Sequence, residues 1–323
     1  MRPPHGSFHR AGKATASGFL LVDKPKGMRS RQVVDIVRGE ARYRGKIGHS
    51  GTLDPLATGL LVLCLGRATR LASYLIRDDK SYLAELELGM ETDTGDAEGK
   101  GVFNGQDRLA ALDEGQILGA FDRQRGVFDQ VPPAYSARKI GGKRAYELAR
   151  KGQEVDMRAS EVEIKELEIL KVEVPIVQFY VKCSSGTYIR SLALDVGRRL
   201  RTGAHLISLR RLEVGPFRVG EAEKLERLID ECRQGNLERW LFPPNAVLGN
   251  LSKVVVDGRG ERLIRQGAPV GEGSFLPLGE GSPPFTQGEE VQVWSVASDF
   301  LAVGRVGREG GGGIVLYPGK VLS

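Results

Sequence analysis

Apolar and polar positions along the chain predict five strands in its first two thirds. Gly18–Val22 and Gly59–Leu65 are uninterrupted apolar runs of strand length, which predict short buried strands. Over residues 82–88, apolar residues alternate with glutamates, the period of a half-buried strand. Two longer strands are expected at Val162–Val174 and Ile176–Ser184.

Helices are predicted between these strands. An apolar stripe follows Ser30, whose side chain is placed to cap the helix N-terminus. Amphipathic helices are expected at Ala68–Ile76 and Tyr188–Leu200. The remaining segments are predicted to form a loop at 44–55, an acidic loop and a helix at 91–115, a basic excursion with a short helix at 131–152, and a helical stretch at 221–240.

The order of these elements predicts the fold class and the domains. Strands and helices alternate irregularly, which favours an α+β fold over a strict βαβ repeat. Phe242-Pro243-Pro244 marks a boundary, and the residues after it read as short strands separated by glycine-rich turns, the pattern of a small β-barrel. We therefore expect a disordered basic tail at 1–17, one domain at 18–248 and a second at 249–323.

Composition narrows the class of protein. Hydrophobic residues make up 41% of the 323 positions and charged residues 27%, which is ordinary for a globular chain with a real core. No apolar run approaches the ~18 residues of a membrane span, and the first 17 residues lack the apolar block of a secretory signal. The three cysteines form no CxxC pair, which argues against disulfides and against a cysteine zinc site. We expect a cytoplasmic protein without a metal.

Positive charge is gathered in patches. The net charge is +6, yet residues 18–50 hold eight Lys and Arg against three acids, and residues 138–151 hold six against Glu147 alone. Residues 84–115 hold nine acids against two basic residues. Separate basic patches suit a polyanion such as RNA. Charge alone is explained equally well by the solvated faces of ordinary helices.

Two stretches carry candidate chemistry. In Gly51-Thr52-Leu53-Asp54-Pro55, a carboxylate is held between an apolar residue and a rigid proline, so Asp54 can act at a sugar carbon as glycosidic carboxylates do. The alternative is a turn aspartate that binds backbone amides. Arg190 falls in the first turn of a predicted helix, where the helix dipole disfavours a cation. A carboxylate partner would explain it, and so would an ordinary surface position.

Other residues are weaker candidates. Tyr82 could stack on a base or be a core aromatic, and His49 among small residues could wedge into a base stack or be an ordinary loop histidine. Asp93-Thr94-Gly95 matches the tripeptide of aspartic proteases but occurs once and lacks the apolar strand that follows it there. Asp93, Asp96 and Glu98 lack EF-hand spacing. Motifs for nucleotide binding, zinc proteases and serine nucleophiles are absent.

Taken together, five ordered motifs resemble the bacterial tRNA pseudouridine-55 synthase family. They are Gly18–Gly27, Gly48–Gly59, Asp79–Tyr82, Val131–Ala137 and Gly186–Arg190, and the segment His205–Leu212 fits as well. The resemblance covers about residues 18–245, and the remainder looks like the small PUA-like RNA-binding domain of such enzymes. It implies a mixed, mostly antiparallel sheet flanked by helices, and a reaction without cofactor or metal in which uracil is detached from C1′, turned and rejoined through C5.

The resemblance also implies residue roles. Asp54 would be the catalytic carboxylate, Arg190 its ion-pair partner and Tyr82 the ring that stacks on the target base. Lys24 and Pro25 would support the active-site loop. Three further roles would fall to Tyr188, which lines the pocket, Leu209, which closes it, and His49, which fills the gap left by the flipped nucleotide. An insertion at about 121–155 would clamp the tRNA T arm through Arg138, Lys139, Lys143 and Arg144.

The expected partner is the tRNA T-arm stem-loop, bound by a monomer. We expect neither membrane association nor a nucleotide cofactor. Two other functions stay open at this point. A non-catalytic RNA-binding or tRNA-folding factor would keep the architecture and make no pseudouridine. A nucleoside or glycoside hydrolase with an aspartate nucleophile would release free base, although the motifs offer no second carboxylic acid. Ser50 departs from the Thr or Gly frequent in the family, a change between small residues that we expect to be silent.

Overall fold

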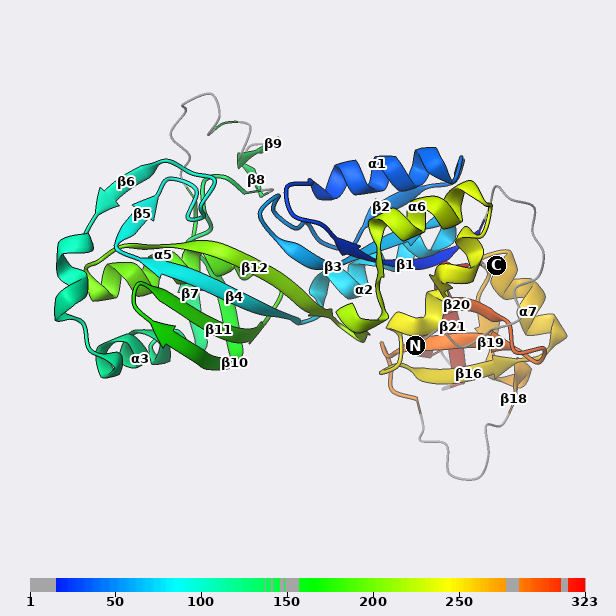
Figure 1. Ribbon diagram of the computed structural model, residues 1–323. Coiled ribbons are helices and arrows are strands. Elements are labelled where there is room, and N and C mark those ends of the chain that lie inside the picture. Colours follow the sequence, from blue (N-terminus) through cyan, green and yellow to red (C-terminus); the bar gives the residue numbers. More distant parts are fainter. Residues whose placement is uncertain are drawn as a thin grey trace.

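The computed structural model describes residues 16–136, 138–140, 142–145, 148, 157–276, 285–308 and 313–322. Most of the described strands form one 11-stranded sheet (Figure 1). Its strands are β1 (Gly18–Lys24), β2 (Ile47–His49), β3 (Thr58–Leu65), β4 (Lys80–Leu88), β7 (Gly126–Gln130), β10 (Ser160–Glu173), β11 (Ile176–Cys183), β12 (Ala204–Val214), β13 (Phe217–Arg218), β14 (Glu223–Lys224) and β15 (Leu241–Phe242).

The strand order confirms the predicted mixed, mostly antiparallel sheet. Along the path β14-β1-β3-β12-β4-β11-β10-β7, only β1 with β14 and β3 with β12 pair in parallel. The β3–β12 contact is short, and the rest of that edge of β3 pairs with β2. The two halves of the sheet therefore diverge beside the loop that joins β2 to β3.

Strands β1 and β3 are apolar throughout because both of their faces are buried. Leu20 and Val22 point into the larger core, under α1 (Ser30–Glu40) and α6 (Leu225–Arg233), which lie side by side in Figure 1. Phe19 and Leu21 point to the opposite face, which is covered by the 3₁₀ helix η1 (Gly66–Leu71) and by α2 (Ala72–Arg77). Burial on both faces explains the uninterrupted apolar runs.

The other half of the sheet has one covered face. Burial alternates along β4 and β11, so that every second side chain points into the core. There α5 (Ile189–Leu200) and α3 (Glu114–Asp122) complete the core, with the ring centroids of Phe121 and Phe179 5.1 Å apart. A small hairpin of β5 (Met90–Thr92) and β6 (Gly101–Asn104) adjoins the end of this half.

A second sheet of six strands confirms the predicted barrel-like module at the C-terminal end. It runs β17-β21-β20-β19-β16-β18 and packs around α7 (Gly258–Arg265). Its strands are β16 (Ser252–Val256), β17 (Val270–Gly271), β18 (Phe275–Leu276), β19 (Glu290–Ser295), β20 (Phe300–Arg308) and β21 (Ile314–Val321). Val303 and Leu322 join the same apolar cluster as Phe19, so the module packs on the first sheet. Among the helices in the described ranges, none has the length and apolar character needed to cross a membrane.

Several local predictions were wrong. Ser30 does not cap α1: it is the first residue of the helix, and its hydroxyl bonds to the backbone of Leu53 instead. The stretch 44–55 is not all loop, because β2 fills the free edge of β3. Residues 68–76 start as a 3₁₀ helix. The helix expected within 91–115 is the 3₁₀ helix η2 (Gln106–Ala111), and the α-helix α3 begins only at Glu114, with Asp113 as its N-cap.

Other predictions fall partly or wholly outside what is described. The basic tail before Ala16 lies outside the described residues, as does most of the short helix expected within 131–152. The described part of that excursion includes a hairpin of β8 (Lys139–Ile140) and β9 (Lys143–Arg144). The stretch 221–240 is only partly helical, since α6 is followed by the 3₁₀ helix η4 (Leu237–Trp240).

Candidate active site

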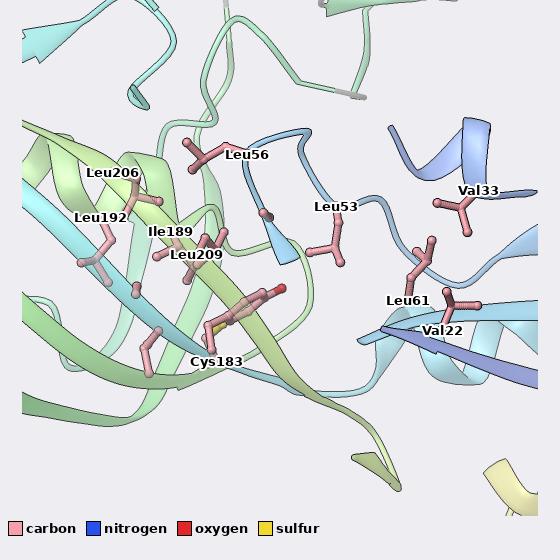
Figure 2. Packing of buried hydrophobic residues seen from close by; sticks show 14 of the residues in the cluster. Val22, Val33, Leu53, Leu56, Leu61, Cys183, Ile189, Leu192, Leu206 and Leu209 are labelled. Carbon is pink, nitrogen blue, oxygen red and sulfur yellow. The ribbon is translucent and has the colours of Figure 1, made fainter. Parts of the chain in front are cut away.

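The loop between β2 and β3 carries Asp54 and is fastened at both sides of it. The Ser30 hydroxyl donates to the Leu53 carbonyl at 3.0 Å and accepts from the Leu53 N–H at 2.8 Å. On the other side, the Pro55 carbonyl accepts from the Gly27 N–H at 2.7 Å and lies 3.4 Å from the Lys24 ammonium. Leu53 and Leu56 are buried between the two halves of the sheet (Figure 2), so the carboxylate between them is held in place.

Arg190, at the start of α5, faces Asp54. Its Nε lies 2.9 Å from Oδ2 of Asp54 and 3.7 Å from Oδ2 of Asp96. The Nε–H does not point along a hydrogen-bond direction, so opposite charge carries this contact. The two terminal nitrogens donate to the carbonyls of Thr94 at 2.7 Å and Tyr135 at 2.9 Å. The two carboxylates offset the unfavourable helix dipole, and the side chain is only 5% exposed.

A second buried arginine, Arg211 on β12, lies behind the same loop and was not singled out from the sequence. Its Nε donates to the carbonyl of Leu60 at 2.8 Å, and its terminal nitrogens reach the carbonyls of Thr52 at 3.4 Å and Gly51 at 3.2 Å. Burial lowers its pKa, and the nearby Tyr82 and Asp54 oppose that change. In the sequence, its signal is a place in the segment His205–Leu212, which resembles the family.

Aromatic and apolar side chains enclose a pocket of about 250 Å³ above the carboxylate. Asp54, Tyr82, Tyr188, Arg190 and Leu209 all line it, as do Lys80 and Arg211. Burial raises the pKa of the Tyr82 hydroxyl to about 12, and the Arg211 guanidinium opposes part of that rise. The pocket therefore combines one carboxylate, neutral aromatic rings and buried cations.

The backbone of Tyr188 is held by a side chain that sequence reasoning missed. Gln130 at the end of β7 accepts from the Tyr188 N–H at 2.8 Å and donates to the Tyr188 carbonyl at 3.1 Å. Ser191, in the first turn of α5, donates to the Val131 carbonyl at 2.8 Å. These bonds fix the start of α5, and with it the direction of Arg190.

Two lysines next to the pocket are buried and held by backbone carbonyls. Lys24 donates to the carbonyls of Met28 at 2.6 Å and Pro25 at 2.9 Å. Lys80 donates to the carbonyls of Ile76 at 2.8 Å and Leu75 at 3.0 Å. Burial lowers the pKa of each amine to about 8, while Asp54 partly restores that of Lys24. Positive potential thus surrounds the Asp54 carboxylate from several elements.

The predicted site residues do not all meet. Lys24 and Pro25 lie next to the loop that carries Asp54, where the Lys24 ammonium contacts the carbonyls of Pro25 and Pro55, but neither residue lines the pocket. His49 lies on β2 and lines a neighbouring hollow. Arg138 donates to the Arg158 carbonyl and to Ser160. The side chains of Lys139, Lys143 and Arg144 lie outside what the structure describes.

The tripeptide that matches aspartic proteases and the acidic residues next to it have structural roles. Thr94 of the Asp93-Thr94-Gly95 turn supplies a carbonyl to Arg190, and Asp93 accepts from the Lys100 N–H at 2.8 Å. Asp96 faces Arg190. Within the described part of the chain, no group of three His, Cys, Asp or Glu side chains is arranged to hold a metal ion.

Comparison with solved structures gives the class of fold. The chain superposes on the structure described as "Crystal Structure of a Cbf5-Nop10-Gar1 Complex" with a TM-score of 0.69 at 26% identity, covering 94% of this chain and 84% of that one. The structure described as "Structure of H/ACA RNP bound to a substrate RNA containing 2'-deoxyuridine" gives 0.70 at 23% identity, covering 95% and 85%. The architecture is the pseudouridine synthase fold with an added C-terminal module.

Sequence comparison gives the family. Residues 38–189 match the TruB family pseudouridylate synthase (N terminal domain), and residues 190–248 the tRNA pseudouridylate synthase B C-terminal domain. The tRNA pseudouridine synthase B of Cupriavidus metallidurans is 41% identical over 309 residues, 92% of this chain and 93% of that protein. That of Aromatoleum aromaticum is 42% identical over 287 residues, 84% and 91%. The chain belongs to the TruB family of pseudouridylate synthases, as its motifs indicated.

Proposed function

We propose that this chain converts the uridine at position 55 in the T loop of tRNA to pseudouridine, with Asp54 as the catalytic carboxylate. The observation that carries the proposal is the Asp54–Arg190 ion pair in a pocket beside a buried tyrosine. Membership in a family of pseudouridylate synthases supports the reaction class, and the names of the relatives support tRNA as the substrate.

The pocket suits a base that has left its stack. Flipping a nucleotide out costs a few kcal/mol, and stacking on an aromatic ring returns about 1–3 kcal/mol per base. Tyr82 would supply that ring, Leu209 would close the pocket, and Tyr188 lines it as well. His49 on the neighbouring β2 fills the gap left in the T loop.

The chemistry then centres on C1′ of the flipped nucleotide. The N1–C1′ bond breaks as Asp54 either attacks C1′ or stabilises the positive charge that develops there. The freed uracil turns within the pocket, and C5 then bonds to C1′; where Asp54 has attacked C1′, this step breaks the Asp54–C1′ bond and releases the carboxylate. C5 then loses its proton while N1 gains one, so the product is an isomer of the substrate. Arg190 keeps the carboxylate pointed at C1′, and Lys24 and Pro25 hold the loop beneath it.

Contacts to the RNA backbone would lie outside the pocket. The basic excursion with Arg138, Lys139, Lys143 and Arg144 would bind phosphates of the T arm, which makes affinity sensitive to salt. The C-terminal module would add affinity through further phosphate contacts without choosing the uridine. An isolated T-arm stem-loop is therefore expected to be a substrate.

The test is tritium release from C5-labelled uridine in a tRNA transcript, with Asp54→Asn beside wild type. The substitution keeps size and removes charge, so we expect turnover below about a thousandth of wild type, a loss of about 4 kcal/mol in activation free energy, with RNA affinity within a few fold. Asp35→Asn, which removes an exposed carboxylate paired with Arg31, is the matched control. Release of free uracil would indicate a hydrolase, and binding without tritium release by wild type a non-catalytic RNA-binding protein.

A further inference from the structure

A second hollow, of about 540 Å³, adjoins the candidate active site. Consecutive residues separate the two: Ser50 lines the first pocket, and His49 lines the second hollow. The hollow lies between the end of α1, the segment that leads into β2, and the start of α2. An RNA strand that places a base in the first pocket would carry its adjoining backbone past this hollow.

The hollow is lined by basic side chains and by no acidic one. Arg38 comes from the last turn of α1, and Arg44 and Lys46 come from the segment that follows. Within the described part of the chain, none of the three forms an ion pair. By contrast, Arg31 on the same helix pairs with Asp35 at 3.0 Å.

Arg38 brings a hydrogen-bond donor to this hollow that the protein itself leaves unused. Its Nε is buried and has no hydrogen-bond partner. A buried donor left unpaired costs about 1–3 kcal/mol, which a ligand that accepts the bond would recover. Guanidinium groups bind phosphate oxygens with two parallel hydrogen bonds, and an ammonium adds a point charge. These are the groups that a phosphodiester requires.

We propose that Arg38, Arg44 and Lys46 form a binding site for backbone phosphates of the substrate RNA, next to the flipped nucleotide. The inference rests on the proposed function, because the nucleotide in the neighbouring pocket brings the phosphates to this place. Three cations across an open hollow match successive phosphodiesters of one strand better than a single small anion. The site positions the strand and carries no sequence information.

The experiment measures binding of a fluorescein-labelled T-arm stem-loop to the full-length protein at several salt concentrations, by fluorescence anisotropy. Arg38→Gln and Lys46→Gln are each expected to weaken binding roughly threefold to tenfold at about 0.1 M salt. Each should also reduce the slope of log affinity against log salt by about 0.7 to 1. KM for pseudouridine formation should rise by the same factor. Arg31→Gln removes one charge from the same helix outside the hollow and should bind like wild type.

Two outcomes would overturn the proposal. One is that Arg38→Gln and Lys46→Gln keep the affinity and salt slope of the Arg31→Gln control. Another is that inorganic phosphate raises the thermal midpoint of wild type but not of Arg38→Gln, while RNA affinity is the same in both, since the hollow would then serve a small anion. Lys46 is exposed, so its substitution tests the site even if Arg38→Gln folds poorly. Failure of the proposed function would show separately, as wild type that binds the stem-loop and makes no pseudouridine.

Discussion

The Arg190 side chain offers the sharpest test of how the site is built. Arg190→Met removes one buried cation and two directed hydrogen bonds, to the carbonyls of Thr94 and Tyr135. It also leaves the Asp96 carboxylate, 6% exposed, without its nearest cation, although Thr94 Oγ1 and the Glu98 N–H still donate to it. Breaking a buried ion pair from one side costs about 3–5 kcal/mol. Because domains of this kind are stable by roughly 5–15 kcal/mol, the variant should still fold.

The conservative variant separates charge from geometry. Arg190→Lys keeps the positive charge, but one ammonium cannot reach both carbonyls and the Asp54 carboxylate together. We expect roughly half the stability loss of Arg190→Met. Activity should fall at least about a hundredfold in both variants, since a displacement of about 1 Å at the reacting carboxylate is enough for such a loss.

Urea unfolding and tritium release on the same samples measure both effects. Arg198→Met is the matched control, because it removes an arginine from the same helix whose side chain is 59% exposed and paired with Glu91. A surface pair of this kind contributes about 0–1 kcal/mol. The reasoning would be refuted if Arg190→Met were no less stable than the control. If Arg190→Met showed the expected loss of stability but kept activity within threefold of wild type, Asp54 would not depend on Arg190.

Three further predictions follow from the buried polar groups around the loop. Ser30→Ala leaves the Leu53 N–H and carbonyl unpaired and should lower the free energy of unfolding by about 1–3 kcal/mol in urea, whereas an unchanged midpoint would contradict the anchoring role. Arg211→Met strips three backbone carbonyls of their donor and should cost about 3–5 kcal/mol; a neutral result would mean that water replaces the guanidinium. Burial lowers the folded-state pKa of Lys24 to about 8 from 10.5, so the unfolded chain binds more protons between these values. Wild type should therefore gain up to about 1.4 kcal/mol per pH unit relative to Lys24→Met between pH 8 and 10, and parallel curves would argue against the shift.

Local pattern was enough to predict most of the elements, because a strand or helix depends mainly on residues a few positions apart. The apolar run at Gly18–Val22 and the alternation over residues 82–88 both became strands. Where local pattern failed, a distant partner decided the outcome. Ser30 had the chemistry of a cap, but Leu53 lies within its reach and satisfies the hydroxyl. Residues 47–49 became a strand because the edge of β3 was free to pair.

The site divides in the same way. The residues on either side of Asp54 predict a carboxylate in a rigid loop, and ordered motifs pointed to the family to which the chain belongs. The resemblance implied Arg190 as the partner of that carboxylate, whereas the further cations near it, Arg211 and Lys24, emerge from the tertiary structure. Arg190 comes from a helix, and Arg211 and Lys24 come from two strands of the sheet. Charges act through space and are strengthened by burial, and neither their distance nor their burial is encoded in the residues next to them along the chain.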